Sequence, residues 1–147
     1  MTLKNDVFML GYDYFLFNRQ GIKIPLYAPI DSHLCVVGES GSGKSTAVLY
    51  WLYKLKKFNA DLFIVDFKKS REFNGITPHF GEFENSYEII KEFYMDFLST
   101  DEGGSGRIKI LLIDEIAGLL THYSMTKDGK QKADEIRNIM SSVLGLV

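Results

Sequence analysis

One segment constrains this chain more than any other: Gly38-Glu39-Ser40-Gly41-Ser42-Gly43-Lys44-Ser45, followed by Thr46. It matches the pattern G-x-x-x-x-G-K-[ST] at every required position. The glycines of such a loop let the backbone curl so that successive N–H groups point at phosphate oxygens, and a following helix start adds positive potential. Lys44 then reaches the β- and γ-phosphates, and the Ser45 hydroxyl binds Mg²⁺. Residues 38–46 therefore predict a P-loop that binds ATP, or alternatively GTP, with magnesium.

The residues on either side of this loop have the pattern that a P-loop requires. Leu34-Cys35-Val36-Val37 is a short apolar run, typical of a strand covered on both faces. From Ser45 to Phe58 apolar residues recur with helical spacing, and three lysines lie near the end of that stretch, where a helix dipole favours cations. We therefore expect a strand, the loop and a helix in succession, with Cys35 as a small buried hydrophobic side chain.

The rest of the chain alternates between strand and helix patterns. The expected elements are a strand pair within 7–30, a strand at 62–65, a helix at 86–98 capped by Asn85, a glycine-rich loop at 101–106, a strand at 108–113, a short helix at 115–122, a polar loop at 124–131 and a closing amphipathic helix from Ala133. Apolar strands alternating with helices predict a three-layer α/β domain around a mainly parallel sheet. We expect residues 1–30 to form an N-terminal β extension and residues 31–147 to form the P-loop domain.

A second chemical element is the run Ile110-Leu111-Leu112-Ile113-Asp114-Glu115. An apolar strand that ends in two carboxylates is typical of P-loop enzymes, in which Asp114 would hold the Mg²⁺ shell and Glu115 would act as the general base that polarises the attacking water. Taken alone, the same residues also fit a solvated strand end or the first charges of the next helix. The P-loop upstream favours the catalytic interpretation.

A third element, Asp66-Phe67-Lys68-Lys69-Ser70-Arg71, follows the expected strand at 62–65. In a parallel sheet this turn lies at the carboxyl edge, the same edge as a P-loop. Asp66 and Lys68 are therefore candidates to support the nucleotide site, or to contact a neighbouring subunit or DNA. The alternative is a solvated charged loop without a specific role.

Charge and composition narrow the remaining possibilities. The formal net charge is −2, so composition alone gives no reason to expect nucleic-acid binding. The chain has 1 cysteine, which excludes an internal disulfide. No stretch has the roughly 20 apolar residues that a membrane span needs, and we expect a cytoplasmic protein.

Taken in order, the segments His33–Ser45, Ile64–Lys68 and Leu112–Glu115 resemble the motor domain of the FtsK/SpoIIIE family of DNA translocases. They are also similar to HerA-type ATPases and to the coupling proteins of conjugation. The resemblance covers roughly residues 22–147, and its most specific part is the turn Asp66-x-Lys68. The sequence departs from chromosome-segregating members at Phe67, where they usually have proline, and in the compact interval from Lys68 to Ile108. Both departures favour a relative from a conjugative or mobile element.

The resemblance implies a RecA-like ATPase that acts on DNA as a homo-oligomeric ring, typically a hexamer, with Mg²⁺ as the metal. A membrane-anchored region outside this chain is also implied for some relatives. In that family a further core strand, carrying a polar sensor residue, follows the helix after the acidic strand. We therefore expect the chain to be a C-terminally truncated motor domain that hydrolyses ATP poorly by itself. No arginine finger can be assigned by resemblance.

Other P-loop classes remain as alternatives. ABC-type transporter subunits share the glycine-rich loop, but they carry a Gln loop and a Ser-Gly-Gly signature that are absent between residues 46 and 113. A small-molecule kinase is a second alternative, which the Asp114-Glu115 pair disfavours. A nucleotide-binding scaffold without turnover is the third.

Overall fold

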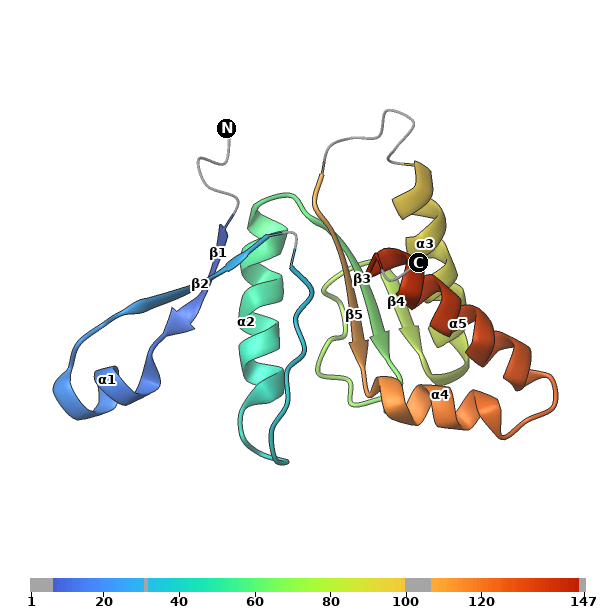
Figure 1. Ribbon diagram of the computed structural model, residues 1–147, viewed down its shortest axis with the longest axis horizontal. Coiled ribbons are helices and arrows are strands. Elements are labelled where there is room, and N and C mark those ends of the chain that lie inside the picture. Colours follow the sequence, from blue (N-terminus) through green and yellow to red (C-terminus); the bar gives the residue numbers. More distant parts are fainter. Residues whose placement is uncertain (1–6, 31, 100–106, 146–147) are drawn as a thin grey trace. The chain divides into compact units, whose positions relative to one another are not determined.

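The computed structural model describes residues 7–30, 32–99 and 107–145 (Figure 1). The chain forms two compact units, Met1–Lys44 and Ser45–Val147, and each is described by itself. None of the described helices is both long and apolar enough to cross a lipid bilayer.

The first unit contains an antiparallel strand pair, as predicted. Strand β1 (Val7–Tyr12) pairs with β2 (Pro25–Pro29), with an irregular register between Met9 and Gly11. Between them lies a helix, α1 (Tyr14–Gln20), that the sequence pattern did not predict. The Asp13 side chain accepts a hydrogen bond from the Leu16 N–H at 2.9 Å, and Gly21 ends the helix with a left-handed φ of 67°. Gly21 is thus the C-cap of this helix.

The predicted strand at residues 34–37 is wrong. The described residues from Ser32 to Glu39 have no regular secondary structure, and the strands that the structure describes in this unit are β1 and β2. Val37 is 86% exposed, and Cys35 is exposed as well, so the expectation of a buried cysteine is also wrong. An apolar run becomes a strand only when a neighbouring strand pairs with its backbone, and the sequence pattern does not reveal whether one does.

A parallel three-stranded sheet lies at the centre of the second unit. Its strands are β3 (Asp61–Asp66), β4 (His79–Glu82) and β5 (Lys109–Asp114), in the order β4-β3-β5. The strands predicted near 62–65 and 108–113 are confirmed. Strand β4 was not predicted, because His79-Phe80-Gly81-Glu82 is short, polar at both ends and interrupted by glycine.

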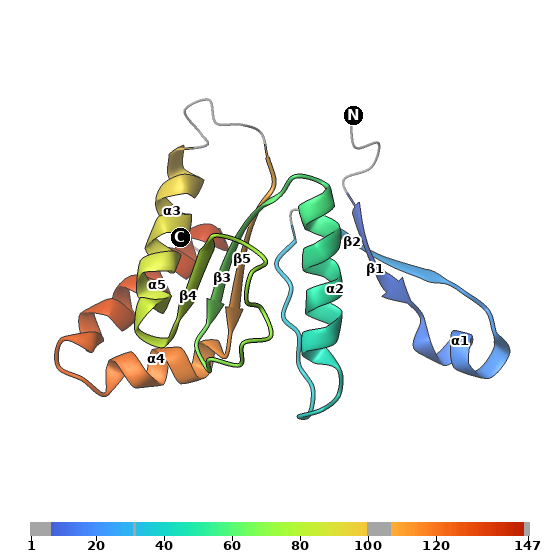
Figure 2. The ribbon, with the colours of Figure 1, turned by 180° about the vertical axis from the view of Figure 1, so that it is seen from behind.

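Helices cover both faces of this sheet (Figures 1 and 2). Helix α2 (Lys44–Lys57) lies on one side, and α3 (Ser86–Ser99) and α5 (Gly129–Val143) lie on the other. A short 3-10 turn, η1 (Phe83–Asn85), precedes α3, and α4 (Ile116–Ser124) follows β5. The predicted three-layer α/β architecture is confirmed.

The core of the unit surrounds the central strand. On the side of α3 and α5 it consists of Val65, Tyr87, Ile90, Leu119, Tyr123, Ala133, Ile136 and Ile139. On the side of α2, the helix buries Leu52 and Leu55, and Lys56 Nζ donates a hydrogen bond to the Ile76 carbonyl at 2.6 Å. Ile64, in the middle of β3, is completely buried. The sequence pattern of an all-apolar strand therefore describes β3 correctly.

The polar loop predicted at 124–131 is shorter than expected, because α5 already begins at Gly129. A Cβ atom at this position would lie 2.3 Å from the Tyr123 carbonyl oxygen, so the corner between α4 and α5 accepts only glycine. The glycine-rich loop predicted at 101–106 and the final residue of the closing helix lie outside the described residues.

Candidate functional site

The glycines of the P-loop adopt the conformations that the motif requires. Gly41 and Gly43 have φ values of 78° and 87°, in a region that side-chain-bearing residues rarely enter. The Ser42 N–H donates a hydrogen bond to the Glu39 carbonyl at 3.2 Å. This bond closes a turn over residues 39–42. These glycine conformations fit the predicted phosphate-binding loop.

Lys44 lies against this loop. Its ammonium group donates hydrogen bonds to the carbonyl oxygens of Gly38 at 2.7 Å and Glu39 at 2.6 Å. A Cβ atom at Gly38 would lie 2.8 Å from Ser42 Oγ and 3.6 Å from Lys44 Cδ, so glycine leaves room for the lysine stem. The loop thus places a positive charge beside its own backbone, which fits an anionic ligand.

Helix α2 begins at Lys44 and carries Ser45 and Thr46 in its first turn. The start of a helix of this length favours anions, and the hydroxyl that follows the lysine in this motif is a magnesium ligand. The residue types and the backbone conformation of 38–46 therefore fit a magnesium–nucleotide complex.

The carboxylates of the acidic element lie at the carboxyl edge of the sheet. Asp66 ends β3 and Asp114 ends β5, and the two are partners in the strand register. Glu115 follows in a left-handed conformation, with φ 63° and ψ 55°, and precedes the first turn of α4. Such a conformation is uncommon for a non-glycine residue and often marks functional positions.

Asp114 lies in an environment that disfavours its negative charge. Burial is the main cause that raises the pKa of its carboxyl group, and the negative charge of Asp66 raises it further, while Lys68 acts in the opposite direction. A cation beside Asp114 would offset this cost. Among the residues that the structure describes, no three His, Cys, Asp or Glu side chains cluster as metal ligands, so a cation at Asp114 would need other ligands, such as the Ser45 hydroxyl.

Glu115 and Lys68 form an ion pair between Glu115 Oε2 and Lys68 Nζ. The side chains are 58% (Lys68) and 37% (Glu115) exposed. The hydrogen bond to Glu115 and then its negative charge raise the pKa of the Lys68 ammonium, so the lysine stays charged. This ion pair therefore connects the turn after β3 to the residue that follows β5.

The structure shows which groups Asp66 contacts. It is completely buried, and its carboxylate accepts hydrogen bonds from the Ser70 N–H at 3.0 Å, the Ser70 hydroxyl at 3.0 Å and the Arg71 N–H at 2.9 Å. Lys69 and Arg71 have positive φ values of 56° and 64° in the turn that these bonds close. All three bonds are internal to the turn, so Asp66 fixes the backbone that carries Lys68. Its suggested part in supporting the nucleotide site or an interface stays a prediction.

An aromatic cluster beside Glu115 was not anticipated from the sequence. The rings of Phe67 and Phe83 stack at 5.2 Å, and His122 lies 4.6 Å from Phe83. A Cβ atom at Gly118 would lie 3.0 Å from Glu115 Cγ and 3.5 Å from the Phe67 ring. The stem of Glu115 is therefore packed at the start of α4. The sequence signal for this was Phe67, which stands where the chromosome-segregating proteins named above usually have proline.

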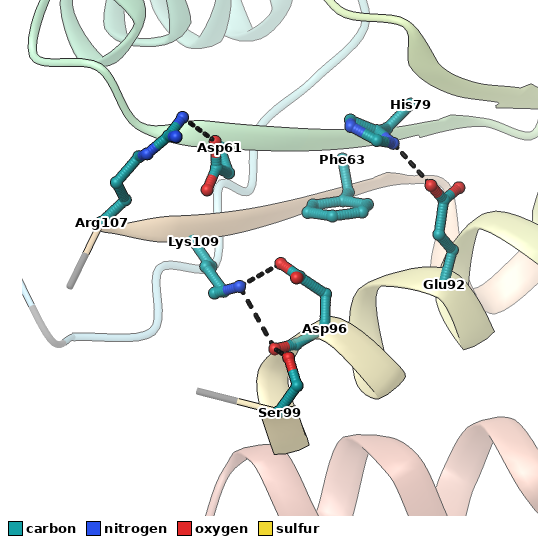
Figure 3. A pocket seen from close by; sticks show the side chains of 8 residues that line it. All are labelled: Asp61, Phe63, His79, Glu92, Asp96, Ser99, Arg107 and Lys109. Atoms are coloured by element: carbon teal, nitrogen blue, oxygen red, sulfur yellow. Dashed lines mark hydrogen bonds and ion pairs between the residues drawn. The ribbon is translucent and has the colours of Figure 1, made fainter. Parts of the chain in front are cut away.

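A pocket of about 550 Å³ opens at the other end of the sheet, where the strands begin (Figure 3). Its polar side chains are already paired: Arg107 forms an ion pair with Asp61 at 3.2 Å, Lys109 pairs with Asp96, and the His79 ring contacts Glu92 at 2.6 Å. Lys109, which interrupts the apolar pattern of β5, is thereby accommodated with a side chain only 10% exposed. The pairs of Glu92 and Asp96 join α3 to the sheet, and the Arg107–Asp61 pair joins the residue before Ile108 to the start of β3. The pocket is therefore part of the packing of this unit.

Comparison with known proteins identifies the family. Residues 14–139 match the family described as the central domain of helicase HerA. The match covers most of the chain. The chain belongs to the HerA central-domain family. No curated protein and no solved structure was significantly similar to it.

Membership in the HerA family makes the chain a P-loop ATPase motor domain of the HerA/FtsK superfamily. The resemblance drawn from the P-loop, the Asp66 turn and the acidic strand is confirmed at this level. HerA-type ATPases typically form hexameric rings, act on DNA and use a nucleotide with Mg²⁺. ABC-type subunits and small-molecule kinases, the enzyme alternatives considered above, are members of other P-loop families.

Proposed function

We propose that the chain is the ATP-hydrolysing motor of a cytoplasmic DNA translocase that works as a homo-oligomeric ring, a hexamer, in the manner of FtsK/SpoIIIE proteins. The observation that carries the proposal is the P-loop at residues 38–46 in a HerA-type chain whose strand β5 ends in Asp114-Glu115. Phe67 and the compact interval before β5 support an origin in a conjugative or mobile element rather than in chromosome segregation.

In this proposal each residue has one task. The P-loop backbone and Lys44 would bind the β- and γ-phosphates, and Ser45 and Asp114 would hold Mg²⁺, which would supply positive charge to the phosphates. Glu115 orients a water molecule and accepts its proton during attack on the γ-phosphate. A single 147-residue chain outside such a ring is proposed to hydrolyse ATP negligibly, because ring motors of this kind use residues of a neighbouring subunit.

Nucleotide binding is tested with Lys44→Ala, against Lys57→Ala as the control. Lys57 is an exposed lysine in the last turn of the same helix, far along it from the P-loop. Titration calorimetry with Mg–ATP is expected to show an affinity loss of at least about 100-fold for Lys44→Ala and no change for Lys57→Ala. Unchanged affinity in Lys44→Ala would refute the P-loop assignment.

Hydrolysis and DNA dependence are tested in the assembled protein. Glu115→Gln is expected to bind ATP normally and to lower turnover at least about 100-fold, as loss of a general base does. Addition of DNA to the unmodified protein is expected to raise turnover, and native mass measurement is expected to find a ring. A near-normal rate in Glu115→Gln would mean that the base is another residue, and a rate insensitive to DNA would contradict translocation.

A further inference from the structure

The contact between Lys68 and Glu115 joins a surface lysine to the residue proposed as general base. Lys68 lies in the turn after β3, and Glu115 lies directly after β5. Because β3 and β5 are adjacent parallel strands, their carboxyl ends bring the two side chains together, and Lys68 Nζ binds Glu115 Oε2.

Neighbouring residues restrict the positions of both Lys68 and Glu115. The buried carboxylate of Asp66 bonds to Ser70 and Arg71, and thereby fixes the turn that carries Lys68. On the other side, the Glu115 stem is packed where Gly118 approaches it, since a Cβ atom on that glycine would lie 3.0 Å from Glu115 Cγ. The ion pair is therefore a product of the fold rather than of two freely moving side chains.

The pair competes with the chemistry that Glu115 is proposed to perform. A general base must offer a carboxylate oxygen to the water it activates. The ammonium group of Lys68 occupies one of these oxygens. Since the lysine is 58% exposed, the pair is weak and exchangeable, as exposed ion pairs generally are. A contact of this strength suits a reversible restraint.

We propose that Lys68 is a positioning residue that restrains Glu115 in the resting motor, and that release of this pair precedes hydrolysis. This inference rests on the proposed role of Glu115 as the base. The chemistry that would release the pair is that of a phosphate, which is a strong alternative partner for an ammonium group. The phosphate comes either from the bound nucleotide or from the DNA backbone.

The first test compares Lys68→Ala with Lys68→Arg and Lys69→Ala at saturating ATP and Mg²⁺. Lys69 is the matched control, because it lies in the same turn but its Nζ lies 5.0 Å over the Phe83 ring. In the assembled protein without DNA, Lys68→Ala is expected to raise kcat about two- to fivefold, the range that an exposed pair can contribute. Lys68→Arg, which keeps the charge, and Lys69→Ala are expected to keep the original kcat.

Repeating the measurement with saturating DNA distinguishes the two sources of phosphate. If DNA releases the pair, Lys68→Ala accelerates only the DNA-free rate, and the stimulation by DNA shrinks by the same factor. If the nucleotide releases the pair, the pair breaks once in every catalytic cycle, with or without DNA. The variant then accelerates the DNA-free rate and the DNA-stimulated rate equally. An unchanged or lowered kcat in Lys68→Ala, or an equal acceleration in Lys68→Arg, would overturn the inference.

A second test does not depend on activity. Urea unfolding of Lys68→Ala, Glu115→Gln and the double variant, without nucleotide, is expected to give non-additive shifts of the midpoint. The same cycle with Lys69→Ala is expected to be additive, and additivity with Lys68→Ala would overturn the inference. Full hydrolysis in Glu115→Gln would refute both the proposed base and the restraint that depends on it. Loss of hydrolysis in Glu115→Gln, together with no effect of Lys68→Ala, would refute the restraint alone.

Discussion

Two apolar runs of similar sequence adopt different structures in this molecule. They are Leu34-Cys35-Val36-Val37 and Leu62-Phe63-Ile64-Val65. The second is the middle of β3, where Ile64 and Val65 are completely buried and strands pair on both sides. The first forms no strand, and Val37 is 86% exposed. Both runs are followed by a turn with left-handed residues. In the P-loop these are Gly41 and Gly43, whereas after β3 they are Lys69 and Arg71.

The difference shows that pairing and burial, rather than the apolar pattern, decide which run becomes a strand. It also shows two ways to form a tight turn. The P-loop uses glycines, which adopt positive φ without steric cost. The turn after β3 uses ordinary residues in the same region, and a buried aspartate holds them there. The first solution leaves the backbone open to a ligand, and the second directs the backbone N–H groups to the protein's own carboxylate.

The largest expected effect contrasts the two runs directly. Ile64→Ala is expected to lower the free energy of unfolding by about 2–5 kcal/mol, because it leaves a cavity in a fully buried position. Val37→Ala removes an exposed side chain and is expected to change it by less than about 0.5 kcal/mol. Urea denaturation measures both. A large loss in Val37→Ala would mean that the first run is buried in solution, and the contrast would disappear.

A smaller effect is expected at the turn after β3. Asp66→Ala removes the acceptor of three hydrogen bonds, so the free energy of unfolding is expected to fall by about 2–3 kcal/mol. Asp66→Asn keeps one acceptor oxygen and is expected to lose about half as much. The measurement is again urea denaturation. Equal stability of Asp66→Ala and the unmodified protein would show that the turn does not depend on its aspartate.

The smallest effect concerns Asp114, whose pKa is raised by burial and by Asp66 above its ordinary value of 3.8. A carboxyl group with a raised pKa in the folded state destabilises the fold when ionised, and this cost disappears as the pH falls through the folded-state pKa towards 3.8. Asp114→Asn is therefore expected to raise the melting temperature at pH 7, without Mg²⁺ or nucleotide, by about 1–3 °C. Scanning calorimetry should find no gain at a pH below 3.8, and a gain that persists there would refute the electrostatic cause.

The sequence predicted those helices and strands whose apolar pattern lies entirely within the element itself. Strand β3, helices α2 and α3, and the acidic end of β5 followed from apolar periodicity and from the carboxylates after it. Strand β4 did not, because its Gly81 and polar ends carry no strand signal and its pairing with β3 is a property of the sheet. Helix α1 was missed because the residues that end it resemble a turn.

For the candidate site, sequence reasoning identified the residue types but not their contacts. The P-loop motif specifies Lys44 and the left-handed glycines, because phosphate chemistry leaves few alternatives. The bonds of Asp66 to its own turn and the pairing of Lys68 with Glu115 depend on the register of β3 against β5. Register between strands distant in sequence is set by packing in three dimensions and cannot be deduced from either strand alone.

The parallel pairing of β3 with β5 also bears on how the chain acquires its shape during synthesis. β4, η1 and α3 all lie in the sequence between these two strands, so their pairing closes a long loop and costs more entropy than a local contact does. A nascent chain exposes the P-loop, α2 and β3 before Asp114 and Glu115 have been translated. The turn bonds of Asp66 are local and can form at that stage, whereas the ion pair of Lys68 must wait for β5. The motor's acidic edge is therefore among the last parts of the described chain to be completed.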